Sequence, residues 1–130
     1  MIKVDWQSGM DYNIRNKSGF MLHGKAASDA EGLTPIELLS GSLALCVSMS
    51  LVKIMEMDKV DPGQLSVSVA AEKAADRPSR VERFVVYVQF PKTIDSSYRN
   101  VLIQKAEQMC TIGNTLQLGA AIEIGASSLK

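Results

Sequence analysis

The stretch that decides the fold is TPIELLSGSLALCVSMSLVKIMEM, residues 34–57. Thr34 is suited to cap a helix, Pro35 fits the first helical position, and Glu37 can return its carboxylate to close a capping box. Apolar residues then lie nearly all round the helix, so its middle should be buried on most sides. The sequence therefore predicts one long central helix with Cys46 near its midpoint.

Residues 33–52 form an apolar stretch that is about long enough to span a membrane. Glu37 and the serines along it would nevertheless be poorly placed in lipid, whereas small residues suit a helix buried against protein. We therefore predict a core helix and no membrane contact.

The flanking segments predict the rest of the fold. Before the helix, residues 2–7, 12–16 and 19–24 form short extended pieces of an antiparallel meander. After it, apolar and polar residues alternate in two strands of a hairpin, residues 65–72 and 84–90. A second, amphipathic helix follows from about Asp95 to Cys110, and a short strand over residues 120–124 ends the chain. Without βαβ alternation, this order predicts an α+β fold in a single domain, residues 1–130.

Charge and composition narrow the kinds of partner. Fourteen basic and fourteen acidic residues cancel. Because neither sign forms a long run, the chain lacks the basic surface typical of nucleic-acid binding. A small molecule or another protein is the expected partner. The first residues lack the apolar stretch of a secretory signal, so we predict a cytoplasmic location, where thiols are normally reduced.

Cys46 and Cys110 are the only thiols in the sequence. A cysteine inside an apolar helix can be an unreactive core residue with a raised pKa. A thiol peroxidase instead needs one sulfur to attack and a second to resolve the sulfenic acid as a disulfide. If the two long helices pack together, these sulfurs can meet. His23 is the only histidine, so no metal or other cofactor is predicted, and a hydrolase that pairs Cys46 with His23 has no support from the spacing.

Glu37 has two possible roles, one as the capping carboxylate and one in catalysis. Nine residues separate it from Cys46, which places the two on opposite faces of one helix, about 13 Å apart. A shared site would therefore require Glu37 of a second subunit, where it would hold an arginine that lowers the pKa of the thiol. The candidate arginines are Arg15, Arg80 and Arg83.

The motifs TPIELL (residues 34–39) and CTIGNTL (residues 110–116), with the small-residue run that leads to Cys46, resemble the OsmC/Ohr family over nearly the whole chain. The resemblance implies an intertwined homodimer, with antiparallel sheets packed on the central helix. In it, Cys46 would attack organic hydroperoxides and Cys110 would resolve, and a dithiol or a lipoyl-bearing protein would restore both. Arg15 is the most plausible counterpart of the family's arginine. The peroxidase branches of the family commonly have an acidic residue where this chain has Ile36, and a proline where it has Thr111. With these two differences, the chain resembles a divergent OsmC-like branch.

Two functions follow as expectations. The first is a thiol peroxidase that uses Cys46, Cys110 and Glu37 to reduce organic hydroperoxides. The second is a noncatalytic dimeric module that binds a hydrophobic small molecule and keeps Cys46 as a core residue. A depressed pKa of Cys46 favours catalysis, and a raised one favours the binding module.

Overall fold

The central helix is present as predicted. In the computed structural model, which describes residues 1–26 and 31–128, α1 spans Pro35–Met57. Its start is the capping box: the Thr34 N–H donates to Glu37 Oε1 at 3.0 Å, and the Glu37 N–H donates to Thr34 Oγ1 at 3.1 Å. These reciprocal bonds satisfy donors that a helix start leaves free, so they fix where α1 begins.

Two antiparallel sheets and two further helices complete the described chain. The first sheet has the order β1 (Lys3–Asp5), β2 (Tyr12–Arg15) and β3 (Met21–Gly24), with Val4 opposite Ile14 and Ile14 opposite Leu22. The second pairs β4 (Ser66–Lys73) with β5 (Val81–Gln89). The helices α2 (Ser96–Met109) and α3 (Thr111–Leu118) follow. The predicted α+β class and element order are confirmed up to α2.

The described residues divide into two compact units. One contains Met1–Ser42 and Ser68–Val86, and the other contains Leu43–Val67 and Tyr87–Lys130. Both cysteines belong to the second unit. The single domain over residues 1–130 stays a prediction.

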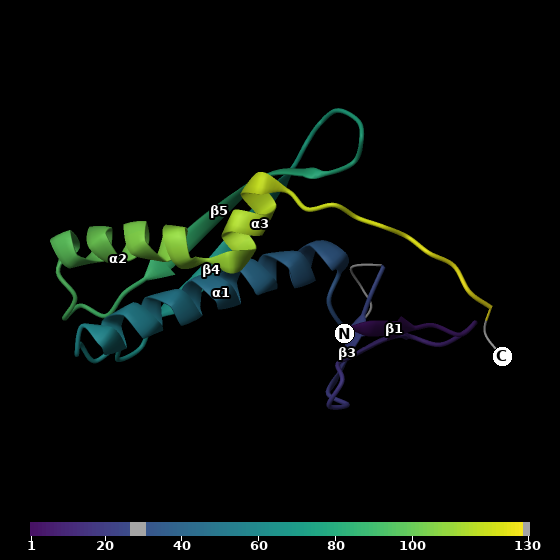
Figure 1. Cartoon of the computed structure of the whole chain (residues 1–130), viewed down its shortest axis with the longest axis horizontal. Helices are drawn as coiled ribbons and strands as arrows, with labels where there is room; N and C mark the ends of the chain where they lie inside the picture. Colours follow the sequence, from purple (N-terminus) through teal and green to yellow (C-terminus); the bar gives the residue numbers. More distant parts are fainter. Residues whose placement is uncertain (27–30, 129–130) are drawn as a thin grey trace. The chain divides into compact units, whose positions relative to one another are not determined.

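The hydrophobic core of the second unit joins α1 to α2. Figure 1 shows α2 running beside the later turns of α1. Their buried residues form one cluster with Ile94, and apolar side chains of β4, β5 and adjoining loops pack against it. The buried members are Leu51, Ile54, Met55, Ile94, Leu102 and Ala106. The alternation predicted for β4 is confirmed, since Val67, Val69 and Ala71 are half-buried and their neighbours are exposed.

Two expectations from the sequence are wrong in the single chain. The first is that α1 is buried on most sides, because Leu45 and Met49 are 61% and 64% exposed. The second is the final strand over residues 120–124. Residues 119–128 have no regular secondary structure (Figure 1). Ile122 and Ile124 in this segment are almost fully exposed. A strand forms only where its backbone groups find a partner strand, and this segment is paired with none among the described residues.

Helix α1 also meets the length and composition expected of a membrane span, alone among the helices of the described residues. The core helix of a soluble protein meets the same criteria. Because Leu51 and Met55 on α1 are fully buried in the cluster with α2, the later turns of the helix pack against protein.

Candidate thiol site

Cys46 lies on α1 at the edge of the core rather than inside it. Its side chain is half-buried and its thiol is free. The Cys46 carbonyl accepts a hydrogen bond from Ser50 Oγ at 2.9 Å, one helical turn later. Cys46 thus lies inside α1 and remains partly exposed to solvent.

Cys110 lies at the junction between α2 and α3. Its backbone N–H donates to the Ala106 carbonyl at 2.9 Å and so ends α2. Its Sγ accepts a hydrogen bond from the Gly113 N–H at 3.3 Å and so caps α3. The thiol is free and only 2% exposed. One residue therefore ends one helix, begins the next and holds its sulfur at the start of α3.

The start of α3 also lies close to α1. A Cβ on Gly113 would stand 3.4 Å from Cys110 Sγ and 3.8 Å from Leu43 Cδ1. Leu43 precedes Cys46 by three residues and shares its side of α1. The face of α1 that carries Cys46 is therefore the face that meets the first turn of α3.

The pKa values of the two thiols are displaced in opposite directions. Burial raises the pKa of Cys46, but the backbone N–H groups of Ile112 and Thr111 and the Cys110 thiol lower it, and the net pKa is lowered. For Cys110, burial raises the pKa, hydrogen bonds from the Gly113 and Ile112 N–H groups lower it, and the hydrogen bond and charge of Cys46 raise it again, so the net pKa is raised. These shifts favour the thiolate at Cys46, with the neutral Cys110 thiol as a hydrogen-bond donor to it.

This arrangement suits nucleophilic sulfur chemistry. The thiolate is the reactive form of cysteine, and backbone N–H groups at a helix start stabilise it. A neighbouring neutral thiol can resolve a sulfenic acid that forms on the first sulfur. The structure thus brings together the two cysteines that the sequence allowed to meet if the two long helices pack together.

Glu37 has the structural role that its sequence context predicted. Its hydrogen bonds with the Thr34 backbone and side chain lower the pKa of its carboxyl group. It lies nine residues before Cys46 on α1, or about 13 Å along the helix axis. Glu37 and Cys46 of one chain therefore do not meet, and a catalytic Glu37 stays a prediction.

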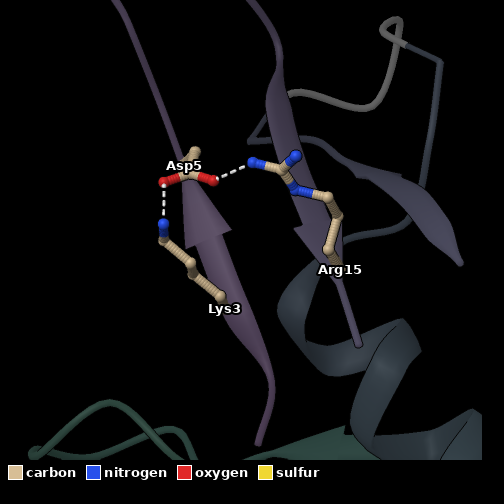
Figure 2. A network of polar contacts seen from close by, with 3 residues as sticks. All are labelled: Lys3, Asp5 and Arg15. Atoms are coloured by element: carbon tan, nitrogen blue, oxygen red, sulfur yellow. Dashed lines mark hydrogen bonds and ion pairs between the residues drawn. The ribbon is translucent and has the colours of Figure 1, made fainter. Parts of the chain in front are cut away.

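Each of the three candidate arginines has a carboxylate partner. Figure 2 shows Arg15 paired with Asp5, whose carboxylate is also 3.5 Å from Lys3 Nζ. The hydrogen bond from Arg15 is the main cause that lowers the pKa of Asp5. The other two pairs are Arg80 with Asp76 at 3.0 Å and Arg83 with Glu72 at 3.5 Å. All three pairs lie in the first unit and are largely exposed to solvent.

A metal centre has no donor set in the described part of the chain. Across residues 1–26 and 31–128, no three His, Cys, Asp or Glu side chains gather closely enough to bind an ion. His23 lies in β3, opposite Asn13.

The sequence interpretation missed the backbone N–H groups of Thr111 and Ile112. It ended the second helix at about Cys110 and assigned no helix after it, whereas α3 is a helix of eight residues that begins directly after Cys110. A signal was available, because a residue with a side-chain acceptor between two apolar helical segments can cap the second of them.

Comparisons with known proteins agree with the fold. A sequence model of the family described as OsmC-like protein matches residues 28–125. No curated protein matches the chain. Among solved structures, an OsmC-like protein from Mycoplasma pneumoniae is 15% identical with a TM-score of 0.81, over 90% of this chain and 86% of that one.

Two further structures carry names related to stress and hydroperoxides. A putative osmotic stress induced and detoxification response protein from Psychrobacter arcticus is 22% identical, with a TM-score of 0.74 over 88% of this chain and 85% of that one. The organic hydroperoxide resistance protein OhrB of Bacillus subtilis is 15% identical, with a TM-score of 0.70 over 90% of each chain. At these identities the structures establish the fold, and the family model covers most of the sequence. The chain belongs to the OsmC-like protein family.

Proposed function

We propose that this protein is a thiol peroxidase that reduces organic hydroperoxides. The observation that carries the proposal is that the pKa values of two adjacent thiols are shifted in opposite directions. The pKa of Cys46 is lowered, and the pKa of Cys110 is raised. An attacking sulfur must be ionised and accessible, whereas a resolving sulfur needs only to be close. Cys46 is half-buried and Cys110 is buried beside it, which fits this division of roles.

The proposed cycle has three steps. The Cys46 thiolate attacks the terminal oxygen of ROOH and breaks the O–O bond, which leaves a sulfenic acid on Cys46 and, after one proton is taken up, the alcohol ROH. The Cys110 thiol then attacks the sulfenic sulfur, forms the Cys46–Cys110 disulfide and releases water. A dithiol, free or carried as a lipoyl group, gives two electrons and two protons to restore both thiols and becomes a disulfide itself. This cycle requires a reducing compartment, in keeping with the cytoplasmic location predicted from the sequence.

A homodimer is the proposed assembly. Leu45 and Met49 flank Cys46 on α1 and are exposed in the single chain, so an apolar surface lies beside the proposed nucleophile. A second copy placed there would exclude water and provide an apolar wall for an alkyl chain, which stabilises the bound tail by roughly 0.8 kcal/mol per buried methylene. Glu37 of the second copy would be the carboxylate that acts across the interface.

Names of similar structures support the substrate class. Solved relatives from Legionella pneumophila and Bacillus subtilis are called organic hydroperoxide resistance proteins. The apolar surface beside Cys46 agrees with an organic oxidant rather than hydrogen peroxide.

The test is stopped-flow oxidation of the reduced protein by cumene hydroperoxide, with mass spectrometry of both thiols. We expect oxidation of the wild type to produce the Cys46–Cys110 disulfide. Cys110→Ser should stop at a sulfenic acid that dimedone traps, and Cys46→Ser should not react. Hydrogen peroxide is the matched control oxidant, and equal rates with both peroxides would remove the claim about the organic substrate.

The noncatalytic binding module is the alternative outcome of this test. It requires Cys46 to be a core residue with a raised pKa. Slow oxidation with both thiols intact, together with a Cys46 that ionises only above its ordinary pKa, would favour the binding module over the peroxidase.

A further inference from the structure

The first turn of α3 contains backbone N–H groups that need acceptors. A helix leaves its first N–H groups without partners inside the helix. At α3 the Gly113 N–H donates to Cys110 Sγ at 3.3 Å, and the Asn114 N–H donates to the Cys110 carbonyl at 2.9 Å. The capping sulfur and carbonyl of Cys110 thus satisfy the third and fourth residues of the turn. The N–H groups of Thr111 and Ile112 remain open to a further acceptor, and the Ile112 N–H is also directed toward Cys110 Sγ.

Cys46 is placed to be that acceptor. Leu43, on the same side of α1, lies 3.8 Å from the position that a Cβ on Gly113 would take, so α1 touches this turn directly. The groups that lower the pKa of Cys46 are the N–H groups of Ile112 and Thr111 and the thiol of Cys110. The packing of the two helices and the electrostatics of the thiol thus identify the same neighbours.

We propose that the backbone N–H groups of Thr111 and Ile112 hold the Cys46 sulfur in its anionic form, in the role that a charged side chain would otherwise fill. Thr111 is the residue at which the proposal can be tested. Its N–H belongs to the first residue of α3 and takes no part in the helix's own hydrogen bonds. That this thiolate reduces peroxides rests on the proposed function. That the N–H groups stabilise the thiolate does not rest on it.

This source of stabilisation does not depend on an arginine. The N–H groups of α3 belong to the same unit as the thiol. A helix start also carries a partial positive charge that does not depend on any side chain.

Proline at position 111 removes the N–H group and leaves the helix in place. Proline is favoured at the first position of a helix, where its missing N–H takes no part in the helix's own bonds. The residue before proline must be extended, and Cys110 already has φ −72° and ψ 103°. Thr111→Pro therefore deletes one donor from the full-length protein, and Thr111→Ala is the matched control that keeps the donor and removes only the side chain.

The test is the rate of alkylation of each thiol in these two variants, followed at the peptide level by mass spectrometry at pH 7. Because the thiolate is the reacting form, we expect Cys46 in Thr111→Pro to react roughly three- to tenfold more slowly than in Thr111→Ala. Circular dichroism checks that both variants keep their helices. Equal Cys46 rates in two folded variants would overturn the proposal.

An NMR titration of the unmodified sequence provides a test that does not depend on the folding of a variant. The amide resonances of Thr111 and Ile112 should shift over the same pH range in which Cys46 ionises, and Cys46→Ser should abolish that shift. Resonances that do not respond to Cys46 ionisation would contradict the proposal. If the amide resonances respond to Cys46 ionisation but the protein does not reduce cumene hydroperoxide, only the peroxidase function is refuted.

Discussion

Removal of the Leu51 side chain should destabilise the second unit strongly. Leu51 is completely buried and packs in the cluster that joins α1 to α2, where Leu102 is also fully buried. Leu51→Ala removes most of this side chain from a site that the solvent does not reach. Buried Leu→Ala changes cost about 2.7–5 kcal/mol, because lost burial and the remaining cavity both contribute. Met55 is a flexible neighbour that can fill part of the space, so we expect about 3 kcal/mol.

The assay is equilibrium unfolding in urea, followed by helical circular dichroism at low protein concentration. A loss of about 3 kcal/mol corresponds to a midpoint lower by about 1–2 M urea, given the usual denaturant dependence of small proteins. Leu45→Ala is the matched control, since it makes the same change on the same helix at a side chain that is 61% exposed. A surface change of this kind should stay within about 0.5 kcal/mol.

One result would refute this reasoning, and another would support it. If Leu51→Ala lowers the midpoint no more than Leu45→Ala does, the α1–α2 cluster is not the main source of stability. If the two effects differ at low concentration but Leu45→Ala becomes costly as the protein concentration rises, the cluster is upheld and the proposed dimer covers Leu45.

Three further predictions concern individual side chains. The hydrogen-bonded Tyr98, whose pKa is raised from 10.0 to about 12, should ionise last in an ultraviolet titration, and Tyr98→Phe should remove that step. Because the raised pKa favours the neutral phenol, its contribution to stability should be complete below pH 10 and should disappear between about pH 10 and 12, as urea unfolding at each pH would show. Thr34→Ala should lower the free energy of unfolding by about 1 kcal/mol, because it removes the helix cap. Thermal unfolding measures this loss, and an unchanged stability would show that the bonds between Thr34 and Glu37 are not significant. In the wild type, iodoacetamide should modify Cys46 well before Cys110 near neutral pH, because the pKa of the first is lowered and that of the second is raised; the reverse order would exclude Cys46 as the nucleophile.

The start of α1 shows what a sequence predicts well. The cap at Thr34, the proline after it and the returning Glu37 are local signals, and the hydrogen bonds that they predict are present. The amphipathic second helix was predicted to within one residue for a similar reason, since Asp95 caps it. A helix whose ends are fixed by residues close to it in the sequence can be predicted from that local sequence.

The exposure of α1 and the end of the chain show where this reasoning fails. An apolar pattern indicates that a surface should be covered, but it does not identify what covers it. Leu45 and Met49 remain exposed in one chain, and Ile122 and Ile124 have no strand to pair with. All four positions follow the expected pattern, and the proposed homodimer is one assembly that would cover Leu45 and Met49.

The thiol site was only half predictable, because half of it is backbone. Spacing and pattern identified Cys46 and Cys110 as two sulfurs on helices that could pack together. The N–H groups of Thr111 and Ile112 cannot be seen in a search for charged residues, since every residue except proline has one. What makes them relevant is their position, at a helix start that faces Cys46. The backbone donors are fixed by the fold and do not depend on the position of any side chain. If the N–H groups are the main source of thiolate stabilisation, replacement of any one arginine should change the ionisation of Cys46 less than Thr111→Pro does.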